Sequence, residues 1–184
     1  MKKDILGAII ERRERINSAL IPTWDELPSL NLYMDQLIFI LSEIFEPYFD
    51  DVPKLINKTI INNYVKLGYI PAPTKKKYAK EHIAYLVVVC SLKQVMPIAA
   101  ISALVRAQTE KMPLSEFYDK FCADRKKALL AALGEAEIKI GDPEYPKTEQ
   151  TALSLALSAQ AYSIVSASVA QSLIPDDETK QKKN

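Results

Sequence analysis

Residues 57–71 read NKTIINNYVKLGYIP, and this stretch is the most informative part of the sequence about the fold. On a helical wheel at about 100° per residue, its polar and apolar side chains separate into two arcs. One arc of roughly 140° is polar and free of acids; it holds Lys58, Thr59, Asn62, Asn63 and Lys66. The opposite arc is apolar and holds Ile60, Ile61, Tyr64, Val65 and Leu67. The division predicts an amphipathic helix over Asn57–Leu67, capped by Asn57 and ended by Gly68.

The charge around this helix is positive, although the whole chain is nearly neutral. The 184 residues carry 24 Lys and Arg against 23 Asp and Glu, for a formal net charge of +1. Between Lys54 and Lys80 there are seven lysines and no acid, whereas residues 43–51 are acidic. Lysine, threonine and asparagine contact phosphates and base edges in DNA. The pattern favours a DNA-binding helix, and the alternative is a solvated lysine-rich face that binds nothing.

A proline-rich stretch follows the helix. Residues 71–78 read PAPTKKKY, and the prolines exclude a helix there. Lys75, Lys76 and Lys77 are three adjacent charges that are poorly suited to burial. We therefore predict that they form a wing that grips the DNA backbone, with Tyr78 beside them.

Several of these segments resemble the MerR family of transcriptional regulators. The run from Thr59 to Pro71 resembles the recognition helix and the start of the wing in that family, and Lys77-Tyr78 resembles the end of the wing. His82, Ile83 and Leu86 resemble the start of the next helix, and Leu92-Lys93 with residues 97–104 resembles the two helices that close the domain. The wing is shorter here, its lysines stand where MerR proteins often have arginine, and the turn before the recognition helix is longer and acidic.

A closer resemblance is to an uncharacterised bacterial family that is distantly similar to MerR. It shows the same Leu32-Tyr33-Met34-Asp35-Gln36 segment and the same run from Ile61 to Lys66. The likeness covers about Trp24 to Cys122. It implies a winged helix-turn-helix core that binds double-stranded DNA through the helix and the wing.

The rest of the chain also reads as helical, so the expected fold class is all-α. We predict helices over Asp4–Leu20, Leu32–Phe45, Lys80–Val95 and Thr148–Leu173, one that starts at Pro97 and one from Pro113 to Gly134. A β-strand is the alternative for the valine run inside Lys80–Val95. The expected organisation is an N-terminal helix (1–23), a winged helix-turn-helix core (24–110), a C-terminal helical region (111–175) and a disordered tail (176–184).

The C-terminal region is marked by a run without charge from Gln150 to Pro175. The run is long enough to cross a bilayer, but its serines, glutamines and alanines favour a closely packed buried helix and no membrane. We predict a homodimer held by Thr148–Leu173, with help from Pro113–Leu133, because two-fold dimers are the commonest oligomers. The alternatives are a core helix within a monomer and a helix that lines a pocket for an unknown effector.

No group of residues in the sequence has the pattern of an enzyme active site. Cys90 and Cys122 form no metal-binding spacing and predict buried free thiols, and the single histidine, His82, predicts a structural role. The sequence has no phosphate-binding glycine loop, HExxH or GxSxG, so no enzyme, cofactor or metal is expected. Trp24 is expected to anchor the core.

The start of the chain is charged and resembles no secretory signal, so a cytoplasmic protein is expected. The sequence therefore predicts a cytoplasmic, sequence-specific transcriptional regulator. A protein–protein adaptor that keeps the winged-helix shape is the alternative.

Overall fold

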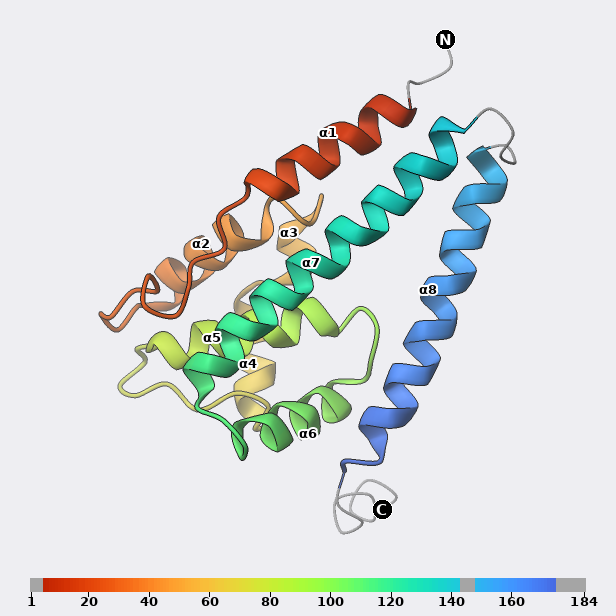
Figure 1. Ribbon diagram of the computed structural model, residues 1–184. Helices are drawn as coiled ribbons and strands as arrows, with labels where there is room; N and C mark the ends of the chain where they lie inside the picture. Colours follow the sequence, from red (N-terminus) through yellow and green to blue (C-terminus); the bar gives the residue numbers. More distant parts are fainter. Residues whose placement is uncertain (1–4, 143–147, 175–184) are drawn as a thin grey trace.

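The computed structural model describes residues 5–142 and 148–174, and this part of the chain is all-helical (Figure 1). The helices are α1 (Ile5–Ser18), α2 (Met34–Phe45), α3 (Val52–Leu55), α4 (Lys58–Lys66), α5 (Lys80–Leu92), α6 (Ile98–Thr109), α7 (Leu114–Gly141) and α8 (Thr148–Gln171). Extended backbone pairs only at isolated antiparallel bridges, Leu32 with Tyr78 and Thr74 with Lys77, among the described residues. The predicted tail 176–184 and most of the loop before α8 lie outside them.

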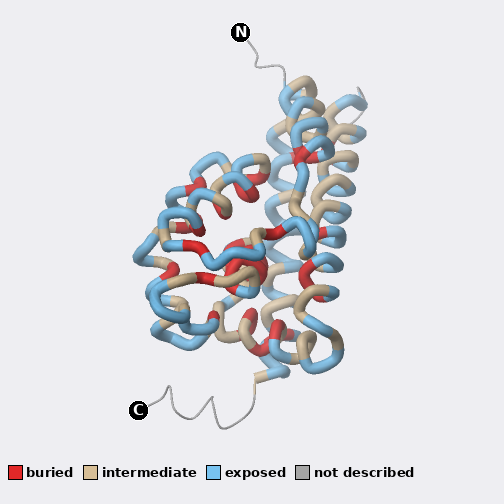
Figure 2. The backbone as a smooth tube through the Cα atoms, turned by 90° about the vertical axis from the view of Figure 1, so that its left-hand side faces the viewer, coloured by how far each residue is buried: buried red, intermediate tan, exposed pale blue. Residues whose placement is uncertain are grey.

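The helices form a core and an arm. Helices α2 to α6 gather around the first turns of α7, and α1, the rest of α7 and α8 extend away from them (Figure 1). Figure 2 shows most of the buried chain on the core side and exposed backbone along the arm. Helix α1 lies along α7, and α8 contacts α6 and α7.

Helix α5 is the centre of the core. Its side chains from His82 to Cys90 are buried except for that of Tyr85. The valine run therefore forms a helix covered on nearly every side, as predicted, although it ends at Leu92 rather than Val95. Cys90 and Cys122 are both buried free thiols, as expected. Trp24 packs against the same core, with its ring edge-on to Tyr118 at a centroid distance of 6.3 Å.

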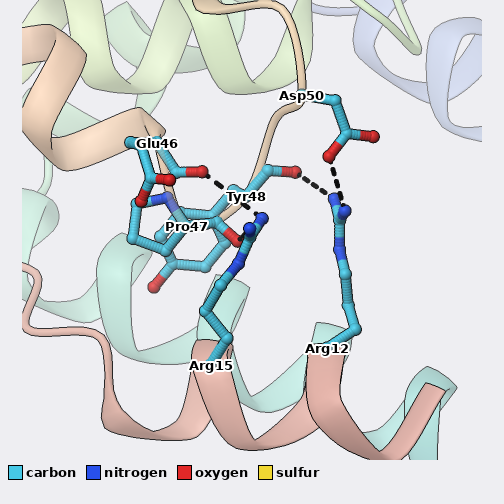
Figure 3. A network of polar contacts seen from close by, with 6 residues as sticks. All are labelled: Arg12, Arg15, Glu46, Pro47, Tyr48 and Asp50. Carbon is cyan, nitrogen blue, oxygen red and sulfur yellow. Dashed lines mark hydrogen bonds and ion pairs between the residues drawn. The ribbon is translucent and has the colours of Figure 1, made fainter. Parts of the chain in front are cut away.

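Helix α1 is tied to the turn that follows α2 (Figure 3). Arg12 donates hydrogen bonds to the Asp50 carboxylate at 2.7 Å and to the Tyr48 carbonyl at 2.9 Å, and Arg15 donates to the Pro47 carbonyl at 3.1 Å. Cations suit this position because the C-terminal end of a helix carries partial negative charge. A small apolar cluster around Ile16, whose side chain is 1% exposed, joins α1 to α7 beneath these contacts.

The prediction that the helix from Pro113 ends at Gly134 is wrong, because α7 ends at Gly141. Its turns beyond Gly134 remain packed: Ala136 is buried, and Glu137 forms an ion pair with Arg13 of α1, with Oε2 3.1 Å from Nε. A glycine inside a helix costs only about 1 kcal/mol relative to alanine, which such packing offsets. Pro97 and Pro113 occupy the N-cap positions of α6 and α7, one residue before the position we predicted.

Helix α8 is exposed along most of its surface. Within the helix only Thr151 and Ala170 are buried, so the alternative of a core helix within one chain is wrong. The large apolar side chains that face outward include Leu153, Leu157, Tyr162, Ile164, Val165 and Val169. By length and composition, with a mean hydropathy of 1.4, α8 is the helix among the described residues that is apolar enough to cross a membrane.

Candidate nucleic-acid interface

Helix α4 is held against the core by its apolar side. Ile61 is fully buried, and Tyr64 and Val65 pack against the main core cluster. At the N-terminus, the Asn57 side chain accepts a hydrogen bond from the Ile60 backbone N–H at 3.0 Å, as predicted for the cap. The Asn57 amide also donates to the Pro53 carbonyl at 3.1 Å, which joins the cap to α3.

The end of α4 is a left-handed turn at Gly68. The backbone of Gly68 has φ of +70°, which is favourable for glycine because it has no Cβ. The Tyr69 N–H donates to the Tyr64 carbonyl and the Gly68 N–H to the Val65 carbonyl, at 2.9 and 3.0 Å. This pair of bonds is the Schellman motif, and it reverses the chain directly after the helix.

The polar arc of α4 faces solvent. All five of its predicted residues are exposed: Lys58, Thr59, Asn62, Asn63 and Lys66. The structure therefore brings these side chains together on one outward face. Leu67, which we placed on the apolar side, is 61% exposed because it is the C-cap residue rather than part of the helix.

An acidic residue outside this sequence segment lies at one end of the polar face. Asp35, in the first turn of α2, forms an ion pair with Lys58, with Oδ1 3.0 Å from Nζ. Both side chains are solvent-exposed. The contact of Asp35 with Lys58 could not be predicted from the sequence, because it joins two helices that are separated along the chain.

The lysine-rich loop is a tight two-residue turn. Thr74 and Lys77 exchange backbone hydrogen bonds of 3.1 and 2.9 Å, and the two residues between them, Lys75 and Lys76, have φ of +52° and +63°. Positive φ at both central residues is the geometry of a type I′ hairpin turn. It directs the chain so that Lys75 and Lys76 are both exposed at the tip.

The base of the hairpin is fixed to the start of α2. Leu32 and Tyr78 exchange two backbone hydrogen bonds of 2.8 Å. The Tyr78 side chain is only 4% exposed and packs edge-on against His82, so burial raises the pKa of its hydroxyl. Lys77 is half-buried, with Nζ 5.1 Å from the centroid of the Tyr33 ring. The structure thus separates Tyr78 and, in part, Lys77 from the exposed lysines.

His82 has a structural contact rather than a place in this surface. The ring nitrogen Nδ1 accepts a hydrogen bond from the Ala79 N–H at 2.9 Å, which caps the start of α5. Within residues 5–142 and 148–174, no three His, Cys, Asp or Glu side chains gather closely enough to hold a metal ion. The chemistry of the exposed surface is therefore that of lysine ammonium, asparagine amide and threonine hydroxyl groups.

Comparison with known proteins gives one family. No curated protein and no solved structure matches the chain. Residues 22–121, more than half of the sequence, match a domain of unknown function, DUF1836. This match confirms the predicted membership in an uncharacterised family and places α2 to α6 inside the shared domain. The protein belongs to the DUF1836 family.

Proposed function

We propose that this protein is a sequence-specific DNA-binding regulator that inserts α4 into the major groove. The observation that carries the proposal is the exposed polar face of α4, on a helix whose other side is anchored in the core. The major groove is about 12 Å wide and admits one α-helix. Asn62 and Asn63 are suited to read base edges, and Lys66 to contact a phosphate.

The order of elements around α4 supports the proposal. Helix α2, the turn that contains α3, helix α4, the Lys75–Lys76 hairpin and helix α5 follow one another as in a winged helix-turn-helix. The resemblance to MerR regulators implies the same arrangement. In this interpretation the hairpin is a minimal wing, and its two exposed lysines contact the DNA backbone beside the groove.

The decisive experiment is selection of bound duplexes from a random DNA pool by the full-length protein, at two salt concentrations. A regulator enriches a common sequence at both, and its affinity falls as salt rises because lysines release counterions from phosphates. A pool that stays random after repeated rounds contradicts sequence-specific binding.

Exposed aromatic residues on α2 and at its N-cap favour a protein–protein adaptor as the second candidate. Phe39 of α2 is 65% exposed, and the N-cap residue Tyr33 is 57% exposed. An adaptor of this kind binds a protein through α2 and leaves the random DNA pool unchanged. A Phe39→Ala variant that still selects DNA normally assigns the selection to α4.

We further propose that the regulator is a homodimer joined through α8. Gln150, Leu153, Leu157, Gln160 and Ile164 follow one another at alternating spacings of three and four residues, and all five are exposed. This spacing forms a seam between paired helices. Residues 150–171 carry no charge, so the same segment of a second copy meets the seam without charge repulsion, and the two glutamines suit a protein interface better than hydrocarbon. Dimerisation would supply two copies of α4 for a palindromic site.

A further inference from the structure

Asp35 introduces a negative charge into a surface that is otherwise basic. It belongs to the first turn of α2, where the helix dipole favours a carboxylate. Its Oδ1 atom lies 3.0 Å from Nζ of Lys58, and the two side chains are 82% and 62% exposed. The pair therefore stands at the N-terminal end of the α4 face, in contact with solvent.

Both ends of this ion pair are attached to fixed backbone. Residue Tyr33, at the start of α2, donates its N–H to the Gln36 side chain at 2.9 Å, which caps the helix beside Asp35. The hydrogen bond from the Asn57 cap fixes the first turn of α4, which contains Lys58. The distance between the two turns is set by the core, so Asp35 stays close to Lys58 when the side chains move.

A phosphate that approaches Lys58 also approaches Asp35. The ammonium and the carboxylate cancel each other at a distance, so the pair attracts a polyanion much less than a free lysine does. Within residues 5–142 and 148–174, the exposed Lys66, Lys75 and Lys76 form no ion pair with a carboxylate. Non-specific attraction to DNA then depends on these three lysines and not on Lys58.

We propose that Asp35 is a specificity-determining residue that suppresses non-specific DNA binding by neutralising Lys58. The inference rests on the proposed function. Each lysine that neutralises a phosphate steepens the dependence of log affinity on log salt by about 0.9. Removal of the Asp35 charge frees Lys58 to act as such a lysine, and the added affinity is the same for every sequence.

The test compares Asp35→Asn with the wild-type protein by fluorescence anisotropy on a duplex of arbitrary sequence. We expect the salt slope of D35N to be steeper by about 0.9, so that its affinity falls roughly 3.5-fold more than that of the wild type between about 50 and 200 mM salt. Glu11→Gln is the matched control, because it removes one exposed carboxylate from α1, on the arm. It should leave the salt slope unchanged.

Lys58→Ala tests whether the effect of D35N depends on Lys58 or only on the net charge of the protein. In the wild-type background K58A should change the salt slope little, and in the D35N background it should abolish the added 0.9. Circular dichroism and urea unfolding of each variant establish that it is folded. A D35N slope equal to that of E11Q overturns the inference, as does a K58A variant that alone lowers the slope by about 0.9.

The two proposals fail in different ways. If the wild-type protein binds duplex DNA and D35N behaves like E11Q, only the role of Asp35 is wrong. If neither wild type nor D35N binds any duplex at low salt, the proposed DNA-binding function is wrong and the inference about Asp35 is overturned with it.

Discussion

The guanidinium group of Arg125 lies over the ring of Tyr48, with its central carbon 4.0 Å from the ring centroid. The rings of Phe45 and Phe49 are 5.9 and 6.0 Å from the same carbon. Arg125 belongs to α7, whereas the three rings belong to the end of α2 and the turn after it. This contact therefore joins the arm to the segment that leads into α4.

The first prediction concerns this contact. We expect Arg125→Ala to lower the free energy of unfolding by about 1–3 kcal/mol, because it removes a cation–π contact and the packing of a long side chain. Arg125→Lys should recover only part of the loss, since an ammonium group does not cover a ring as a planar guanidinium does. Urea unfolding measures both. Lys127→Ala, at an exposed position of α7, is the control and should change stability by less than about 0.5 kcal/mol.

The second prediction separates backbone contacts from base contacts on α4. Lys66→Ala should weaken binding to all DNA sequences and reduce the salt slope by about one unit. Asn62→Ala and Asn63→Ala should keep that slope and change which sequence is selected, because an asparagine reads a base edge. Anisotropy titrations and repeated selection provide the two readouts. Identical behaviour of all three variants and the wild type would contradict the assignment of this face.

The third prediction distinguishes the shape of the hairpin from its charge. Replacement of Lys75-Lys76 by Asn-Gly should stabilise the protein slightly, because asparagine and glycine adopt positive φ more readily than lysine. The same variant should bind DNA more weakly at low salt, since two exposed charges are lost. Thermal unfolding and anisotropy measure the two effects. Weaker binding that does not depend on salt would show that the lysines act through folding.

The fourth prediction tests the seam on α8. Leu157→Glu should convert the proposed homodimer to a monomer, because it would bury a charge between two apolar helices. Ser158→Glu places the same charge on an exposed position that points away from the seam and should leave the dimer intact. Sedimentation at micromolar concentration decides between them. A wild-type protein that sediments with the mass of one chain, 20.7 kDa, would exclude the dimer.

The fifth prediction follows from the burial of Cys122. Burial raises the pKa of this thiol from 9.0 to about 11. The unfolded chain therefore loses the proton first, so the thiol favours the folded state fully below about pH 9 and loses that contribution as pH rises toward 11. Urea unfolding at several pH values should show a fall in stability over this window that is smaller in Cys122→Ala. Equal slopes in both proteins would contradict the burial of the thiol.

Much of the core was accessible from the sequence because its signals are local. The two arcs of α4, the cap at Asn57 and the reversal at Gly68 all lie within 12 consecutive residues, and the structure has each of them. Tyr78 was misjudged because its neighbours are lysines, whereas its burial comes from the pairing of its backbone with Leu32. The spacing of apolar residues in the sequence does not reveal such backbone pairing.

The features that could not be predicted depend on contacts between distant segments. Asp35 reaches Lys58 only through the angle between α2 and α4. Helix α7 continues past Gly134 alongside α1, where Arg13 forms an ion pair with Glu137, and nothing in the sequence near Gly134 indicates that contact. The exposure of Leu153 and Leu157 depends on which side of α8 the rest of the chain covers.

Because α7 is long, a small tilt at one end produces a large displacement at the other. Its 28 residues extend for about 42 Å. Phe117 and Tyr118 at one end are buried in the core, while the other end contacts α1 in the arm. A tilt of about 5° at the core end would move the far end by roughly 3.7 Å over such a length. In the proposed dimer joined through α8, the spacing between the two α4 helices would depend on this angle and on the contact of α8 with α6.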